Sequence, residues 1–455
     1  MDKQKLGDIA TVEISGVDKK TKDGEQEIRL CNFVDVYYNW AITTAQHDGF
    51  MFATARPNEI SKFQLKKGQV ALTKDSETRD DIGVPTYIAD DFDDVILGYH
   101  CALITPNKDI LDGRYLNALL HTDYAKKYFA CNASGSGQRY ALSVEALNSF
   151  PVPMIPLRNQ ERIGEIFSAL DKKIELNRRI NQNLEAMAKQ FYDYWFVQFD
   201  FPNEEGKPYK SSGGKMVWND KLKREIPEGW DDGILIDIAN ITMGQSPDGS
   251  SYNEVGEGML FYQGSTDFGM RFPSVRQYTT APSRFAKKGD ILMSVRAPVG
   301  SINIANNDCC IGRGLSAINS KLGSISHLYY ILNDLRIAFD QRNAAGTTFG
   351  SITKEDLYSL PIIIPSDEVI RAFDKICSPM FDRQMILGEE IDILTKQRDE
   401  LLPHLMNGQV SVNSDLSVYK KRRGKVPLLD SKRCVRHLSP SSAIHNCFGQ
   451  RILDR

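Results

Sequence analysis

The side chains best suited to chemistry in this sequence are those that could hydrogen-bond a nucleic acid. Arg and Lys suit guanine, Asn and Gln suit adenine, and Ser, Thr and backbone amides suit phosphates. Such residues gather in short Gly- and Ser-flanked stretches, for example SGSGQRYALS (134–143) and CIGRGLS (310–316). The candidate DNA contacts are Lys74, Arg79, Tyr99, His100, Gln138, Arg139, Tyr140, Tyr262, Gln263, Arg296, Arg313, Thr347, Thr348 and Phe349.

Any one of these side chains is more commonly a solvated or structural residue than a base contact. They gain weight because they recur at matched places in an internal repeat. KLGDIATV (5–12) matches ILIDIANI (234–241), and FQLKKGQVALT (63–73) matches RFAKKGDILMS (284–294). The junction SGQRYALSVEALNSFPVPMIP (136–156) matches AGTTFGSITKEDLYSLPIIIP (345–365). The repeat predicts two similar globular domains whose loops diverged for different ligands, and one duplicated stable domain without divided function is the alternative.

Motifs for catalysis are missing from the sequence. There is no G-x-x-x-x-G-K-[ST] phosphate loop, no F-x-G-x-G with [DN]-P-P-[YF] as expected of an adenine methyltransferase, and no P-D…[DE]-x-K nuclease signature. The seven histidines and eight cysteines form no cluster at metal-ligand spacing. The sequence therefore predicts a binding protein with no catalytic residue, metal or cofactor of its own. A solitary DNA-modifying enzyme is the alternative.

Each copy of the junction runs into a long segment with apolar residues at heptad spacing. In the first, Ile163, Phe167, Leu170 and Ile174 alternate at steps of four and three; in the second, residues 373–401 carry apolar side chains at every seventh position. So narrow a stripe needs a partner helix. We expect the two helices to pair antiparallel within the chain about a pseudo-twofold axis, with a homodimeric coiled coil as the alternative.

The positions that interrupt these seams are polar. They are Asn177 and Asn181 in the first helix and Gln384 and Arg398 in the second.

Composition limits the remaining possibilities. The chain has 455 residues, 41% of them hydrophobic and 25% charged, and no apolar run long enough for a membrane span or a signal peptide, so the cytoplasm is the expected compartment. The net charge is −3, but residues 414–455 hold ten Lys or Arg against three Asp, which gives this tail +7. Such a charge balance leaves room for a local basic face without predicting indiscriminate nucleic-acid binding.

The predicted fold is α+β, with two tandem mixed α/β domains and two long helices that pair as an antiparallel coiled coil. The expected boundaries are 1–156 for the first domain, 157–198 for the first helix, 199–230 for a Pro/Gly-rich linker, 231–365 for the second domain, 366–410 for the second helix and 411–455 for a basic tail predicted to be disordered.

Several of these segments together resemble the specificity (S) subunit of type I restriction-modification systems. The resemblance covers residues 1 to about 412 and rests on GKPYKSSGGKMVWNDKLKREIPEGW, DIANITMGQSP, SVRAPVGSINIA, IGRGLSAI, LPIIIP and KQRDELLPHLMNGQV. It implies two target recognition domains that each read half of a split site on double-stranded DNA, and two helices that set the gap. The basic tail departs from the family pattern.

The resemblance also implies the partners. Two modification (methyltransferase) subunits would carry S-adenosylmethionine, and restriction subunits would use ATP and Mg, so this chain would need no cofactor and no membrane. A coiled-coil scaffold without a DNA role is the competing interpretation. The base contacts are not transferred from the family, because its recognition domains are where its members differ most.

Overall fold

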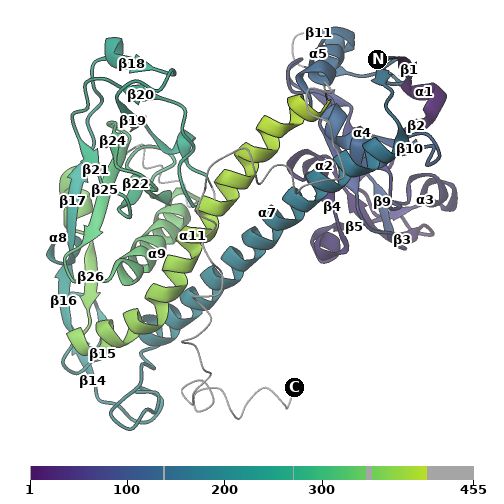
Figure 1. Ribbon diagram of the computed structural model, residues 1–455. Coiled ribbons are helices and arrows are strands. Elements are labelled where there is room, and N and C mark those ends of the chain that lie inside the picture. The colour runs from purple at the N-terminus through teal and green to yellow at the C-terminus, as the bar shows by residue number, and fades with distance from the viewer. Residues whose placement is uncertain (1, 137–138, 270, 345–350, 407–455) are drawn as a thin grey trace, which may run out of the picture. The chain divides into compact units, whose positions relative to one another are not determined.

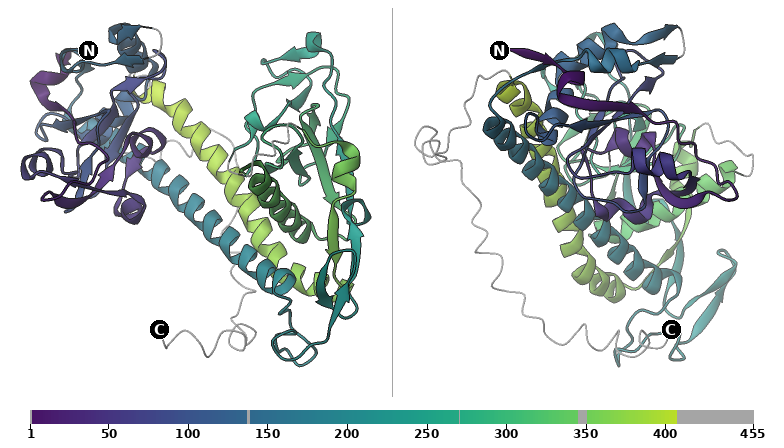
Figure 2. Two further views of the ribbon diagram at one scale, coloured as in Figure 1. Left: turned by 180° about the vertical axis from the view of Figure 1, so that it is seen from behind. Right: turned by 90° about the vertical axis from the view of Figure 1, so that its right-hand side faces the viewer.

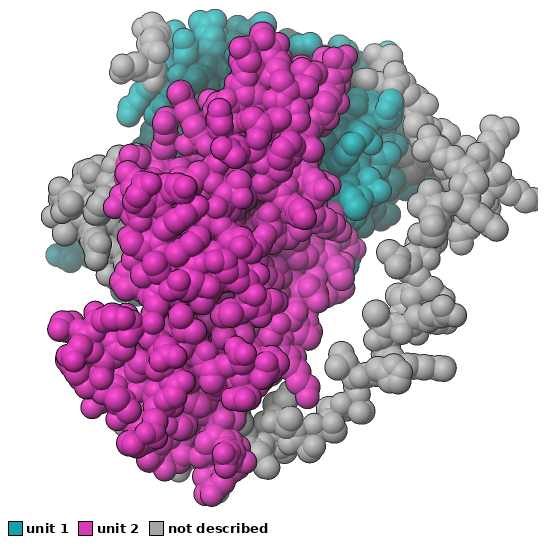
Figure 3. Space-filling view, turned by 90° about the vertical axis from the view of Figure 1, so that its left-hand side faces the viewer, with its two compact units in different colours: residues 1–176, 392–427 teal, residues 177–391, 428–455 magenta. Residues whose placement is uncertain are grey.

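The computed structural model describes residues 2–136, 139–269, 271–344 and 351–406, with the side chains of 136 and 337–344 excepted. The chain divides into two compact units, which Figure 3 shows in different colours. Unit 1 comprises residues 1–176 and 392–427, and unit 2 comprises residues 177–391 and 428–455. Each long helix therefore begins in one unit and ends in the other.

Unit 1 is built on a five-stranded sheet of order β2-β10-β6-β8-β4 and a three-stranded sheet of order β5-β3-β9 (Figure 1). Its elements are β1 (Lys3–Lys5), α1 (Leu6–Ile9), β2 (Ala10–Ile14), β3 (Gln26–Cys31), α2 (Phe33–Tyr38), β4 (Ala41–Ile42), η1 (Thr44–Gly49), β5 (Met51–Ala55), α3 (Pro57–Phe63), β6 (Val70–Thr73), β7 (Asp75–Ser76), β8 (Pro85–Ile88), β9 (Val95–Leu97), β10 (Cys101–Pro106), α4 (Gly113–Leu120), α5 (Asp123–Asn132), β11 (Ser134–Ser136), β12 (Arg139–Ala141), α6 (Val144–Asn148) and β13 (Pro151–Pro153). The central strands β6 and β10 are buried almost throughout, as expected of apolar runs covered on both faces.

Unit 2 repeats this scaffold with a four-stranded sheet, of order β17-β25-β22-β23, in place of the five-stranded one. Its elements are β14 (Met216–Asn219), β15 (Arg224–Pro227), β16 (Asp231–Ile234), α8 (Leu235–Ile238), β17 (Ala239–Met243), η3 (Gly249–Ser251), β18 (Tyr252–Asn253), β19 (Met259–Tyr262), η4 (Ser265–Asp267), β20 (Tyr278–Thr279), β21 (Phe285–Ala286), β22 (Ile291–Ser294), β23 (Ile302–Ile304), β24 (Cys309–Ile311), β25 (Leu315–Ser320), α9 (Ile325–Ala344), α10 (Lys354–Tyr358) and β26 (Pro361–Ile364).

The strand order shows that the two units are copies of one design. The sheet β17-β25-β22-β23 corresponds to β2-β10-β6-β8. The parallel pair β19 and β24 corresponds to β3 and β9, and the antiparallel terminal pair β16 and β26 corresponds to β1 and β13. The prediction of a duplicated α+β domain is confirmed.

The long helices are α7 (Leu157–Tyr192), continued by the π-turn η2 (Asp193–Val197), and α11 (Asp367–Met406). In unit 2, Asn177 Nδ2 donates to Glu390 Oε2 at 3.0 Å, and Gln384 Nε2 donates to the carbonyl of Asn181 at 3.2 Å. As numbers rise along α7 they fall along α11, so the pair is antiparallel (Figure 2).

In unit 1 the same two helices share a core cluster. It joins Ile163 and Phe167 of α7 to Leu402 and Leu405 of α11. The helices thus bury their stripes against each other inside one chain, as the heptad pattern predicted.

The segment 199–230, predicted to be a linker, contains a hairpin of β14 and β15 whose Ile226 is buried in the core of unit 2. Phe201 stacks between Tyr209 and Trp230, with ring centroids 4.7 and 5.0 Å apart. The hairpin left no sequence signal because its strands are short and half of their residues are exposed, so they lack an apolar alternation.

Two further observations concern the solvent environment. None of the helices in the described part of the chain has the length and apolarity to cross a membrane. The six cysteines within that part are free thiols, and five of them are buried.

Two histidines, His327 buried and His121 half-buried, make stability depend on pH. Burial lowers the pKa of His327 to about 3, and burial together with the charge of Arg398 does the same for His121. Below about pH 6.5 these histidines become protonated in the unfolded chain but stay neutral in the folded one. The stability that the two neutral histidines contribute is therefore complete above pH 6.5 and is lost as pH falls toward 3. We expect each histidine to lower the free energy of unfolding by about 2 kcal/mol between pH 7.5 and pH 5.

Urea unfolding at both pH values measures this effect. His121→Met and His327→Met should each reduce the difference between the two pH values. An unchanged difference in both variants would show that neither imidazole is held neutral.

Candidate nucleic-acid interface

In unit 1, the end of β6, the start of β7 and the residue before β10 bring three charged or titratable groups together. Lys74 Nζ lies 2.8 and 2.7 Å from the two carboxylate oxygens of Asp75, and His100 Nδ1 hydrogen-bonds the same carboxylate. Burial raises the pKa of Asp75, but the hydrogen bonds from Lys74 and His100 outweigh it and leave this pKa below the ordinary value. Asp75 therefore stays charged and holds Lys74, so a phosphate would have to compete for the amino group.

The small sheet β11-β12-β7 brings residues 75–79 beside residues 139–141. Tyr140 pairs with Ser76 across the strands, and the guanidinium of Arg79 lies 5.0 Å from the Tyr140 ring centroid. Tyr99 and Arg139 are both exposed. Predicted residues from three separate stretches thus form one polar and aromatic surface, which suits stacking and hydrogen bonding to a nucleic acid.

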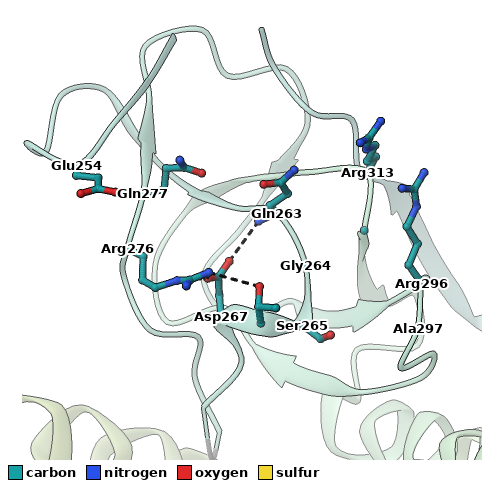
Figure 4. A pocket seen from close by; sticks show the side chains of 12 residues that line it. Glu254, Gln263, Gly264, Ser265, Asp267, Arg276, Gln277, Arg296, Ala297 and Arg313 are labelled. Atoms are coloured by element: carbon teal, nitrogen blue, oxygen red, sulfur yellow. Dashed lines mark hydrogen bonds and ion pairs between the residues drawn. The ribbon is translucent and has the colours of Figure 1, made fainter. Parts of the chain in front are cut away.

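In unit 2, a pocket of about 490 Å³ gathers three of the predicted residues, Gln263, Arg296 and Arg313 (Figure 4). The side chains of Arg296 and Arg313 extend in the same direction on one side of it. Both are exposed, and neither guanidinium has an ion-pair partner within the described ranges. Two free guanidinium groups beside an amide side chain are the donors that read guanine edges or hold phosphates.

Sequence reasoning missed Arg276 and Asp267 in the same pocket. The Arg276 guanidinium lies 2.5 Å from the Asp267 carboxylate, which is buried and also accepts from the backbone N–H of Gln263 at 3.4 Å. This ion pair stiffens the turn that presents Gln263. No spacing signal could have found it, because the two residues are joined only by the fold of the loop.

Backbone hydrogen bonds show that the two candidate surfaces occupy equivalent places. The N–H of Lys74 donates to the carbonyl of His100, and the N–H of Val295 donates to that of Gly314, both at 2.9 Å. A second pair of backbone hydrogen bonds, accepted by the carbonyls of Lys74 and Val295, shows the same equivalence. The N–H groups of Leu142 and Ile352 donate to the carbonyls of Lys74 and Val295 at 2.8 and 2.9 Å.

These bonds align the two loops residue by residue. Asp75 in unit 1 therefore corresponds to Arg296 in unit 2, and Tyr99 to Arg313. One backbone frame carries different side chains in its two copies.

One predicted contact is corrected by the structure. Tyr262 is fully buried in a cluster with Leu292 and Ile311, because the last residue of β19 points into the core while the next residue, Gln263, turns outward. Tyr262 therefore has no surface to offer DNA. The predicted contacts Gln138, Thr347, Thr348 and Phe349 lie outside the described residues, as does the tail 411–455.

Comparison with known proteins agrees with this design. The family model described as "Type I restriction modification DNA specificity domain" matches residues 1–186 and 227–395. The chain is 30% identical over 366 residues to a putative type I restriction enzyme MjaX specificity subunit of Methanocaldococcus jannaschii, covering 79% of this chain and 82% of that protein. It is 25% identical over 415 residues to the type I restriction enzyme HindI specificity subunit of Haemophilus influenzae, covering 77% and 88%.

A solved structure supports the fold. The type I restriction-modification system S subunit from M. genitalium aligns with a TM-score of 0.55 at 14% identity, over 89% of this chain and 95% of that one. The matched residues, duplicated scaffold and paired helices lead to one conclusion: the chain belongs to the family of type I restriction-modification specificity subunits.

Proposed function

We propose that this chain is the non-catalytic recognition subunit of a type I restriction-modification complex and binds a bipartite site on double-stranded DNA. Each unit would read one half-site, and α7 and α11 would hold the two half-sites at a fixed gap. The observation that carries the proposal is the single backbone frame with different side chains, Asp75 and Tyr99 in one copy and Arg296 and Arg313 in the other. Two different surfaces on one scaffold suit two different half-sites.

The exposed faces of the two helices offer surfaces for partners. Large apolar side chains stand in solvent at Leu176, Met187, Ile386 and Ile393, each about half exposed. Single exposed apolar residues are common on proteins, but a helix that already buries one stripe has no need of a second. We propose that two modification subunits dock on these faces and supply the S-adenosylmethionine chemistry, and that restriction subunits with ATP and Mg join through them.

Mapping N6-methyladenine across the genome, with and without the gene for this chain, tests the proposal. We expect one bipartite motif of fixed gap to lose methylation entirely when the gene is removed, because the methyltransferase subunits would then have no means of locating it. A methylation pattern that does not change would refute a role in DNA recognition. A coiled-coil scaffold with no DNA role predicts that result.

A further inference from the structure

In unit 2, the segment that leaves the DNA-facing pocket returns to the helices through Arg271. Its Nη1 lies 3.2 Å from Glu185 Oε2 of α7, and its guanidinium lies 4.6 and 5.5 Å from the ring centroids of Phe381 of α11 and Tyr329 of α9. The side chain is only 9% exposed. A planar cation held by a carboxylate and two aromatic rings, away from water, tolerates little change in angle.

The next residue adds a steric contact. Phe272 is buried with Ile304 and Phe381, and its ring lies against Gly388 of α11 so closely that a Cβ there would overlap it. Gln384, one turn earlier, donates to the same Glu185 oxygen at 3.0 Å. The recognition domain thus contacts both helices at one point: Arg271 forms an ion pair with α7, and Phe272 packs against α11.

The same segment builds the pocket. The N–H of Ser274 donates to the carbonyl of Asp267 at 2.7 Å, and Arg276 is ion-paired to the Asp267 side chain. Gln263, the predicted base contact, begins this segment. A tilt of the segment at Arg271 would therefore carry the DNA-facing groups with it.

Unit 1 has a counterpart contact. Trp40 follows α2 just as Arg271 follows η4, each after the equivalent strand, β3 or β19. The guanidinium of Arg398 of α11 lies 4.7 Å from the Trp40 ring, which also stacks on His121 at 4.0 Å and tilts against Phe167 of α7 at 5.9 Å. In unit 1 the arginine lies on α11, and in unit 2 it lies on the recognition domain. Both contacts nevertheless join a recognition domain to the long helices.

We propose that these two arginine–aromatic contacts, Arg398 with Trp40 and Arg271 with Phe381, are positioning elements that set the angle at which each recognition domain meets its helices. They thereby restrict the gap that the protein accepts between half-sites. This inference rests on the proposed function. Adjacent base pairs are spaced by about 3.4 Å along DNA, so a small tilt of a domain is enough to bring a neighbouring register within reach.

The test uses the complex assembled with its methyltransferase subunits. Duplexes carrying both half-sites at the native gap, and at gaps one base pair shorter and longer, are methylated in competition. We expect Arg271→Met and Arg398→Met each to reduce the preference for the native gap by about tenfold, the scale of losing a desolvated arginine–aromatic contact. The half-site sequences should not change. Arg271→Lys should restore less than half of the lost preference, because an ammonium lacks the planar stacking face.

A matched control is available in the same domain. Lys288 Nζ lies 2.6 Å from Glu389 of α11, but the two side chains are 56% and 43% exposed. Such a pair is screened by solvent, so Lys288→Met should keep the native gap preference. Unfolding midpoints of all variants separate positioning from general loss of stability.

The outcomes are distinct. A wild-type complex that shows no bipartite motif sinks the proposed function itself. A second outcome is a wild-type complex that accepts one gap, with Arg271→Met and Arg398→Met variants that keep the same preference. That result overturns the positioning role and leaves the proposed function standing. Altered half-sites in these variants would also overturn the positioning role, since they would make the arginines base contacts. Should Arg271→Met fail to fold, Arg398→Met carries the decision.

Discussion

Replacing Arg296 and Arg313 together with glutamate is expected to weaken selective DNA binding through unit 2 severely. Both guanidinium groups line the pocket, both are exposed, and neither is neutralised by an ion pair among the residues that the structure describes. Each well-placed arginine contributes about 1–3 kcal/mol of discrimination, so losing both and adding two negative charges should weaken binding at least a hundredfold. If they hold phosphates, the slope of log affinity against log salt should also fall by about one per arginine.

Binding to duplexes that carry the motif, measured at several salt concentrations, checks this result. The charge-matched control is Lys207→Glu with Lys215→Glu in the hairpin segment, where both lysines are 64–70% exposed and paired with surface glutamates. That variant makes the same change in net charge outside the pocket. Equal losses in both variants would mean that only overall charge matters, and would remove the pocket from the interface.

Phe373→Ala is expected to destabilise unit 2 by about 3–5 kcal/mol, the usual loss for a fully buried aromatic ring. Phe373 is 0% exposed and lies at the meeting point of α11, the end of α7 and α9. Its ring centroid is 5.0 Å from that of Phe196, 5.8 Å from Trp195 and 6.3 Å from His327. Nothing nearby can fill the cavity, because the neighbouring rings are themselves packed against other partners.

Chemical unfolding, with hydrogen exchange to assign the change to unit 2, measures the loss. Phe285→Ala is the matched control, since Phe285 belongs to the same unit but is 53% exposed, and it should change stability by less than about 0.5 kcal/mol. A small effect of Phe373→Ala would show that the helix pair and the recognition domain are not held together by this aromatic cluster.

The sequence predicted the duplicated domains and the paired helices because both leave local signals. A heptad stripe is visible along one segment, and short repeated anchors such as KKG keep their order along the chain. The polar interruptions were also visible, and three of them, Asn177, Asn181 and Gln384, are buried between the helices in unit 2. The helix α11 even continues through Pro379, where loss of one N–H is outweighed by the burial of Cys377 and Phe381 on either side.

The candidate interface was only partly predictable. Gln263, Arg296 and Arg313 were selected as loop residues, but nothing local tied them to one pocket, and Tyr262 was selected with its neighbour although it faces the core. Which side of a strand end is buried depends on the sheet that covers it, and that sheet is formed by residues far along the chain.

The sequence by itself therefore determined the architecture of this protein: two copies of one domain and two helices that must pair. Only the tertiary structure decided which side chains share a surface. It paired Arg276 with Asp267 and placed Arg271 between the two helices. The physical reason is that periodicity records burial along one segment, whereas a binding surface is assembled from several segments whose contacts leave no trace in spacing.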